Sequence, residues 1–298
     1  MQKDPSTSDP KLREAKARMQ HVKRTAAFIG IGWLVFFILA MILSASLRLS
    51  QDIFPPIIAC GSMAFLIALA VMLFRACSIK QQIAAAAMDE ADIAGLLRGY
   101  CTLETFLPVD GMNAHFLEKW LRFDRVSGTG YFKGALGSRA LASAWEFLEE
   151  SDREGYGIVY RGQITWLEAR GSFPGTLRLV RRKSGASGIF RRESGFKRVE
   201  ISREWDALWN VDAKVEEEAC VHALLNEETE LYRRLLNMVS IDFVVYQGNT
   251  ILMGGVRGVN GAGKMDDPQK VRAAYEAAYE GLFREDIPAV DSAVFPEG

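Results

Sequence analysis

The chain has 298 residues, which is enough for one or two domains. Its 36 lysines and arginines are balanced by 37 aspartates and glutamates, so no overall basic field favours nucleic acid as a partner. The four cysteines show no C-x-x-C spacing, so neither a zinc knuckle nor a disulfide framework is indicated.

Two uncharged runs near the N-terminus predict a transmembrane helical hairpin. They cover residues 25–47 and 53–74. At 1.5 Å per residue, the first run makes a helix of roughly 34 Å, enough to cross a hydrocarbon core of about 30 Å. The alternatives are a cleaved signal peptide for the first run and a buried core helix for the second. Both are less expected, because the apolar part of a signal peptide is shorter and soluble helices seldom lack charge for so long.

The flanking charges predict the orientation of this hairpin. Seven basic residues precede the first run and Arg75 and Lys80 follow the second, whereas the connecting loop carries only Arg48. Basic residues mark the cytoplasmic side of a membrane, so both termini are expected in the cytosol. The predicted parts are a basic N-terminal segment, the transmembrane hairpin, a helical connector and a cytosolic α+β domain: residues 1–24, 25–79, 80–112 and 113–298.

Two features of the N-terminal part leave alternatives open. Residues 11–24 show helical spacing of apolar residues between cations, which suits either a simple cytoplasmic anchor or a helix that binds anionic lipid. Ala26 with Gly30, and Ala64 with Ala68, have small-x-x-x-small spacing. Such pairs allow close contact either between the two helices of one hairpin or between the spans of different chains in a homo-oligomer.

Several segments are predicted as helices from their composition and spacing. The stretch 215–238 has Asn226 as a possible N-cap, and the last helix has Asp267 as its cap. The alanine-rich helix predicted over residues 80–107 should end at Pro108. The predicted helices are residues 80–107, 113–123, 138–150, 215–238 and 268–283.

Other segments alternate apolar and polar residues and are predicted as strands. Gln247-Gly248-Asn249 reads as a hairpin turn between two of them. Helices and strands mix without a regular βαβ order, so the part after the hairpin is predicted to be an α+β domain. The predicted strands lie within residues 155–169, 175–182, 196–202 and 239–256.

Gly258, Gly263 and Lys264 have the G-x-x-x-x-G-K spacing of a phosphate-binding loop. The hydroxyl residue that should follow the lysine to bind Mg²⁺ is replaced by Met265. The next helix starts late, at Pro268, so its N-terminus does not directly follow the loop. We therefore predict that this segment does not bind a nucleotide.

The sequence gives no catalytic, cofactor or metal site. Its three histidines, His21, His115 and His222, are isolated, without a second histidine at the i, i+4 spacing of a metal site. The G-x-S-x-G motif of a nucleophile elbow does not occur. The chain is more expected to be a non-enzyme than an enzyme.

One basic cluster stands out in the second half of the chain. Its two halves are separated by Lys-Ser-Gly-Ala-Ser-Gly, which predicts an exposed, mobile loop. Beside a membrane, such a loop gains about 1 kcal/mol per cation from anionic lipid. Only Phe190 and Phe196 interleave the charges, which disfavours nucleic acid; the plain alternative is a solvated loop. The cluster consists of Arg178, Arg181, Arg182, Lys183, Arg191, Arg192, Lys197 and Arg198.

Over about residues 115–285, the chain resembles the bacterial membrane-protein family catalogued as domain of unknown function 3137. Stretches that carry the likeness are FKGALGS, GIVYRGQITWLEA, FKRVEISREWDALWNVDAK and VSIDFVVYQGNTILMGG. The matching positions are Phe196, Val199, Trp205, Trp209, Val211, Phe243 and Val244. Where the family commonly has Asp-x-x-x-Ala before its helix, this chain has Lys214 to Cys220. The resemblance implies a bacterial inner membrane, two N-terminal spans and a cytosolic α+β domain, and it brings no known activity.

These observations predict a non-catalytic membrane-anchored protein without a cofactor. Its cytosolic α+β domain would bind an unknown protein partner or anionic lipid. The alternative is a membrane-tethered enzyme or small-molecule sensor, with a pocket formed by Trp205, Trp209 and Tyr246 near His222. A filled apolar core at that place would dismiss the alternative.

Overall fold

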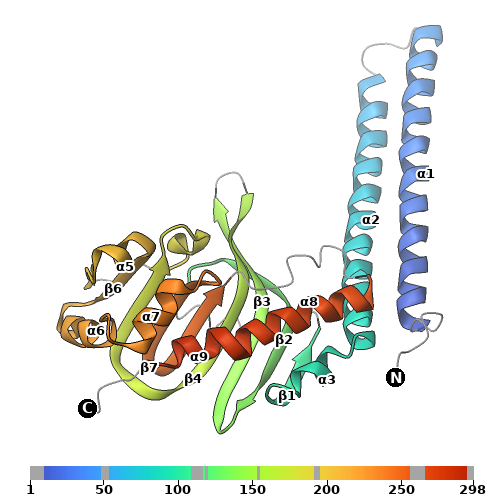
Figure 1. Cartoon of the computed structure of the whole chain (residues 1–298). Coiled ribbons are helices and arrows are strands. Elements are labelled where there is room, and N and C mark those ends of the chain that lie inside the picture. Colours follow the sequence, from blue (N-terminus) through green and yellow to red (C-terminus); the bar gives the residue numbers. More distant parts are fainter. Residues whose placement is uncertain are drawn as a thin grey trace. The chain divides into compact units, whose positions relative to one another are not determined.

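The computed structural model describes residues 10–47, 54–108, 117, 120–152, 155–190, 195–255 and 266–293. The chain forms two compact units, Met1–Glu90 and Ala91–Gly298. The first consists of two long apolar helices and the second is an α+β sheet domain (Figure 1). The phosphate-loop-like segment 258–264 and most of the predicted helix 113–123 lie outside the described residues.

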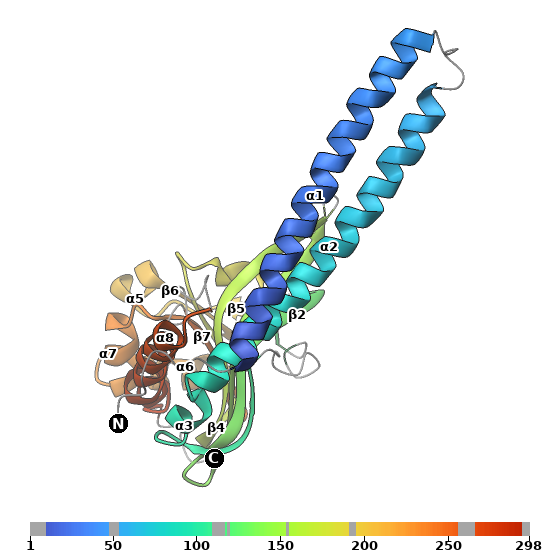
Figure 2. The same ribbon diagram turned by 90° about the vertical axis from the view of Figure 1, so that its right-hand side faces the viewer.

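The first unit is a helical hairpin of α1 (Pro10–Leu47) and α2 (Phe54–Glu90), which lie side by side (Figure 2). Both helices are long and apolar enough to cross a membrane. Large apolar side chains point away from the unit, including Phe28 and Phe74, which are 73% and 83% exposed. This exposure is opposite to that of a soluble helical hairpin, which buries its largest apolar side chains.

The packing between α1 and α2 does not use Gly30. A Cβ atom added at Gly30 would meet nothing within 4 Å, whereas one added at Gly61 would collide with the ring of Phe36. The ring of Trp33 lies 5.1 Å from that of Phe65, so aromatic contacts join the two helices. Gly61 and aromatic side chains therefore contribute to the contact between the two helices.

The predicted helical connector is correct only in part. α2 continues to Glu90, and the short helix α3 (Ile93–Leu97) follows, with Asp92 accepting the Gly95 N–H at 3.0 Å. Residues Thr102–Leu107 then form strand β1, so the predicted helix is wrong there. The alanines end before this segment, and its threonines and Phe106 favour an extended backbone.

The second unit contains a seven-stranded antiparallel sheet. Its order is β1-β2-β3-β4-β6-β5, and β7 pairs with β4 outside this path. β4 is thus the central strand. The strands are β1 (Thr102–Leu107), β2 (Arg125–Leu136), β3 (Arg139–Asp152), β4 (Gly155–Arg181), β5 (Phe196–Arg198), β6 (Trp209–Lys214) and β7 (Ile241–Gly255).

The helix predicted over residues 138–150 is wrong, because this segment is strand β3. Leu136 pairs with Arg139 around a tight turn in which Gly137 has φ 67°, a value that suits glycine. β3 is paired along one side with β2 and along the other with β4. The two strand partners outweigh the helix propensity of its alanines, leucines and glutamates.

The hairpin predicted at Gln247-Gly248-Asn249 is also wrong. β7 is continuous and stays paired with β4, from Val180 opposite Phe243 to Gln163 opposite Gly255. Gly248 has φ 55°, and the register of the pair shifts between Glu168 and Thr176. The glycine permits an irregularity in a paired strand rather than a chain reversal.

The β4–β7 ribbon bends so strongly that its two ends meet, and the curvature of β4 is visible in Figure 1. The Tyr160 hydroxyl donates to Asp242 Oδ2 at 3.3 Å. A Cβ atom at Gly255 would collide with the carbonyl oxygen of Ser240. Apolar side chains fill the inside of the bend; they are Leu117, Trp120, Leu121, Leu148, Tyr160, Ile164, Val180, Ala186, Ile189, Phe243, Val245 and Leu252.

The predicted helix 215–238 is divided in the structure. Its pieces are a 3₁₀ turn, η2 (Val215–Glu217), and the helices α6 (Glu218–Leu224) and α7 (Glu230–Asn237). Thr229 caps α7 by accepting the Tyr232 N–H at 3.3 Å. Asn226, predicted as the cap, instead accepts the Glu228 N–H in the connecting turn.

The remaining helices flank the sheet. α5 (Arg203–Leu208) precedes β6, and α8 (Pro268–Gly281) lies across the sheet in Figure 1. α8 continues through a π-helical turn, η4 (Leu282–Asp286), into α9 (Ile287–Val290). The predicted last helix and its cap are confirmed, because Asp267 accepts the Gln269 N–H at 3.1 Å.

Candidate partner-binding surface

The eight predicted cations do not share one exposed loop. Arg178 and Arg181 belong to β4, Arg182 and Lys183 follow it, and Lys197 and Arg198 belong to β5. Arg191 and Arg192 lie outside the described residues. The expected mobile loop is partly a 3₁₀ turn, η1 (Gly185–Gly188), in which Ala186 is buried and after which Ile189 is buried. These two apolar side chains anchor the segment to the core.

Arg178 is a buried member of the predicted cluster and makes contacts within the sheet. It lies opposite Asp212 of β6, and Asp212 lies opposite Arg198 of β5, so the three side chains form one row on the same face of the sheet. Arg178 is only 6% exposed, and its guanidinium lies 4.2 Å from the ring centroid of Phe196. Burial raises the pKa of Asp212, while the charges of Arg178 and Arg198 oppose this rise.

Arg181 points to the opposite face of the sheet. It lies across from Trp209, with its guanidinium 5.5 Å from the indole ring, and donates a hydrogen bond to the Met238 carbonyl oxygen. The Arg181 guanidinium therefore interacts with β6 on one side and with the end of α7 on the other. Arg178 and Arg181 thus make contacts within the domain, which distinguishes them from the exposed cations of the cluster.

Of the six predicted cations that the structure describes, four are exposed. By the spacing of strands and of residues along them, the Cα atoms of Arg182 and Arg198 are about 16 Å apart, close enough for one partner to contact both. We call this set the basic edge. It consists of Arg182, Lys183, Lys197 and Arg198.

A buried carboxylate lies where the two ends of the β4–β7 ribbon meet. Asp242 is 6% exposed and accepts the Tyr160 hydroxyl. Burial raises the pKa of Asp242, and the hydrogen bond from Tyr160 and the charge of Arg181 only partly oppose this rise. The pKa of Tyr160 is raised in turn, first by its own burial and then by Asp242, so its hydroxyl keeps its proton.

The change in the free energy of unfolding caused by Asp242→Asn should therefore be more favourable at pH 7 than at pH 4. The raised pKa means that the folded protein holds this proton more tightly than the unfolded chain, whose pKa is near 3.8. As pH rises from that value through the folded pKa, wild-type stability falls, whereas the asparagine variant avoids this loss. Urea titrations of both proteins between pH 4 and 7 give the difference. If the asparagine variant becomes less stable relative to the wild type as pH rises, the pKa of Asp242 is not raised in the folded protein.

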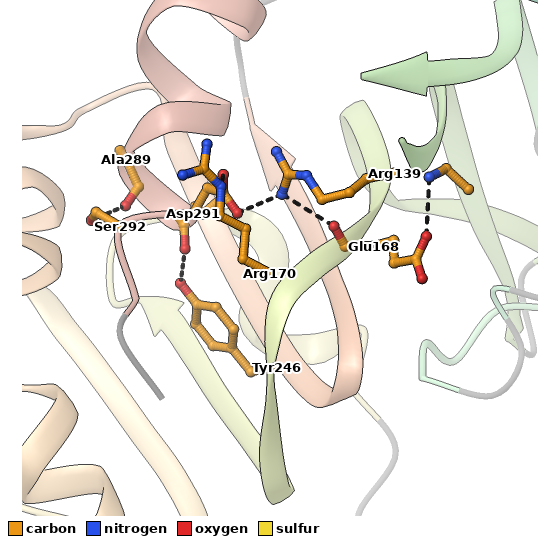
Figure 3. Close-up of polar contacts among 9 residues, drawn as sticks. Arg139, Glu168, Arg170, Tyr246, Ala289, Asp291 and Ser292 are labelled. Carbon is orange, nitrogen blue, oxygen red and sulfur yellow. Dashed lines mark hydrogen bonds and ion pairs between the residues drawn. The ribbon is translucent and has the colours of Figure 1, made fainter. Parts of the chain in front are cut away.

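A cluster of charged side chains joins the C-terminal helix to the sheet (Figure 3). Asp291 receives Arg139 Nη1 at 2.6 Å and Arg170 Nε at 2.9 Å. Arg139 also donates to the Glu168 carbonyl oxygen at 3.2 Å. Nearby, the Tyr246 hydroxyl donates to the Val290 carbonyl oxygen at 2.8 Å. Because these groups engage one another, the cluster acts as a structural clamp.

The aromatic side chains proposed for an enzyme or sensor pocket are buried, whereas the histidine proposed to lie near them is on the surface. Trp205, Trp209 and Tyr246 are fully buried, and the Trp205 ring stacks between Trp209 and Tyr232 at 5.9 and 5.0 Å. His222 is exposed on α6, with Nε2 3.8 Å from Glu218 Oε1. The place predicted for the pocket is a filled aromatic core. Within the described ranges, no group of three or more His, Cys, Asp or Glu side chains could hold a metal ion.

Sequence reasoning missed two small cavities between the sheet and the α8–η4 helix. Each has a volume of about 10 Å³, and Gln163 lines both. One is bordered by Tyr279, whose hydroxyl is buried without a protein partner among the described residues. This volume fits about one water molecule. No residue spacing in the sequence predicts such a cavity, because its walls come from strands and a helix that are far apart in the chain.

Comparisons with known proteins give little further information. No family model matches the chain, and no curated protein matches it. Among solved structures, the chain is similar to the crystal structure of the mycobacterial trehalose monomycolate transport factor A, TtfA, at 10% sequence identity and a TM-score of 0.39. That match covers 71% of this chain and 96% of the other. A likeness of this size carries no conclusion about function.

Proposed function

We propose that this chain is a non-catalytic protein anchored in the bacterial cytoplasmic membrane by α1 and α2, with both termini in the cytosol. In this proposal its α+β domain binds a protein or anionic-lipid partner through the basic edge. The observation that carries the proposal is the exposure of these four cations, one of which, Arg198, lies in a row with Asp212 and the buried Arg178. We also propose kinship with the family of domain of unknown function 3137.

The anchor is supported by the exposed apolar surface of the hairpin and by the charges that flank it. Two tests address it directly. Sodium carbonate should leave the full chain in the membrane fraction, and a reporter fused after Gly298 should be active only in the cytosol. Release by carbonate, or reporter activity outside the membrane, would remove the anchor from the proposal. A homo-oligomer that packs through the Gly30 face of α1 stays a prediction.

Neutralising the basic edge should weaken binding of the domain to anionic vesicles by about a thousandfold. Four cations at about 1 kcal/mol each contribute roughly 4 kcal/mol, which corresponds to nearly three powers of ten. The measurement is co-sedimentation of residues 91–298, a compact unit, with vesicles of phosphatidylcholine and phosphatidylserine. The variant replaces four residues by glutamine: Arg182, Lys183, Lys197 and Arg198.

A matched variant controls for net charge. Four other exposed cations of the domain are Lys133, Arg170, Lys270 and Arg284, with side chains that are 53%, 74%, 81% and 70% exposed. Their change to glutamine should alter vesicle binding less than threefold. Equal losses in both variants would show that total charge, and not the basic edge, attracts lipid. Absence of vesicle binding by the wild-type domain would dismiss lipid and leave an acidic protein surface as the partner to test.

A further inference from the structure

The two small cavities between the sheet and the α8–η4 helix share one lining residue, Gln163 of β4. We call the first the tyrosine cavity, because Tyr275 and Tyr279 of α8 line it, and the second the aspartate cavity, because Asp286 of η4 lines it. Thr165 of β4 also lines the aspartate cavity. These five polar side chains are at most 9% exposed. Polar groups buried to this extent need hydrogen-bond partners, because an unpaired one costs free energy.

The groups of the sheet and of η4 that line the cavities have partners within the protein. Gln163 Nε2 donates to Ser143 Oγ at 3.1 Å, and Ser143 Oγ lies 2.7 Å from Thr165 Oγ1. Asp286 Oδ1 accepts the Ser240 hydroxyl at 2.8 Å. A side-chain amide has two N–H donors and an acceptor oxygen, and a carboxylate accepts several hydrogen bonds. These groups can therefore bond to a small polar molecule in addition to their protein partners.

The Tyr279 hydroxyl is the group that requires such a molecule. It is buried and has no protein partner among the described residues. Burial raises the pKa of Tyr279 well above its usual value, and Tyr275 and Cys101 raise it further, so the hydroxyl keeps its proton and needs an acceptor. The ring is fixed by an edge-to-face contact with Phe132 at a centroid distance of 5.6 Å. A water-mediated hydrogen bond is nearly as favourable as a direct one, whereas an unpaired hydroxyl is not.

The size and charge of the cavities select the ligand. A volume of about 10 Å³ is that of a single water-sized sphere, so each cavity is too small for an organic molecule. A divalent cation would leave a net positive charge beside Asp286, the one carboxylate that lines the aspartate cavity, which is unfavourable in a buried place. We propose that each cavity binds one ordered water molecule and that Gln163 bonds to both.

The two waters form part of the contact between the C-terminal helix and the sheet. In the tyrosine cavity the water accepts a hydrogen bond from the Tyr279 hydroxyl and donates one to the Gln163 carbonyl oxygen. In the aspartate cavity the water donates to the Asp286 carboxylate and accepts from the Gln163 amide. Water-mediated hydrogen bonds thus join α8 and η4 to β4, in addition to the packing of rings. This inference depends neither on the membrane anchor nor on the basic edge.

X-ray radiolysis of the full chain in detergent, followed by mass spectrometry, tests the proposal directly. X-rays convert water into hydroxyl radicals, and a radical formed from a bound internal water oxidises the side chain beside it even when that side chain is buried. Tyr279 should therefore be oxidised at a dose that leaves Tyr246 unmodified. Tyr246 is the matched control, because it is equally buried, donates directly to the Val290 carbonyl oxygen and lines neither cavity. Equal oxidation of the two tyrosines, or no oxidation of Tyr279, would overturn the proposal.

The variant Tyr279→Phe gives a second result, whose sign separates a hydrated cavity from a dry one. If the hydroxyl bonds to a water, its removal should lower the midpoint of thermal unfolding of the full chain by about 2–4 °C, the effect of one hydrogen bond. If the hydroxyl is unpaired, its removal should raise the midpoint. Tyr246→Phe is the control, because it removes a direct hydrogen bond to α9 and should also lower the midpoint. A Tyr279 variant at or above the wild-type midpoint would show that the tyrosine cavity is dry.

Discussion

Replacing Asp291 by alanine is expected to lower the free energy of unfolding of residues 91–298 by about 3 kcal/mol. The Asp291 side chain is 6% exposed and accepts two arginines, and its partner Arg139 is 15% exposed. The substitution leaves a largely buried guanidinium without its carboxylate, which is the costly way to break an ion pair. Urea unfolding followed by circular dichroism gives the free energy.

Arg170→Ala is the matched control, because the Arg170 side chain is 74% exposed and its ion pair is open to solvent. Its loss should cost less than about 1 kcal/mol. Hydrogen exchange adds a local measurement, since the amides of α9 should exchange faster in the Asp291 variant than in the wild type. If both variants lose the same small amount, the clamp does not hold α9 on the sheet.

Replacing Phe243 by alanine is expected to cost about 3–5 kcal/mol in the free energy of unfolding. Phe243 is fully buried where the ends of the β4–β7 ribbon meet. Its ring makes edge-to-face contacts with Tyr160 and Phe190 at centroid distances of 5.5 and 5.3 Å. The change removes the ring from both contacts and leaves a cavity in the centre of the bend.

Phe243→Leu keeps most of the buried volume and should cost about half as much or less. Thermal and urea unfolding of both variants separate the two results. Alanine and leucine variants with the same stability, both close to the wild type, would mean that the ribbon ends do not form a packed core. Such a result would contradict the bent β4–β7 arrangement.

The sequence predicts the helical hairpin well, because uncharged length is a local property of the chain. It predicts strand β3 badly, because alanine, leucine and glutamate favour a helix until strands on both sides supply hydrogen bonds. The error at Gly248 has a different cause. A glycine with positive φ serves a hairpin turn and an irregular paired strand equally well, and only the distant strand β4 decides between them.

The candidate surface shows the same limit. The sequence identifies a cluster of cations, but burial depends on the register of strands that are far apart in the chain. Arg178 meets Asp212 and Phe196 only when β4, β6 and β5 are assembled.

The long strand β4 has a consequence for the order in which a newly made chain can fold. Strands β1 to β4 follow one another closely and can pair as soon as they leave the ribosome, whereas the partner residues on β7 come 63 to 92 positions later. Until those residues emerge, one edge of β4 is an open template of the kind that promotes aggregation. Synthesis beyond Gly255 is therefore the step that protects this edge, and a chain truncated before β7 is expected to aggregate.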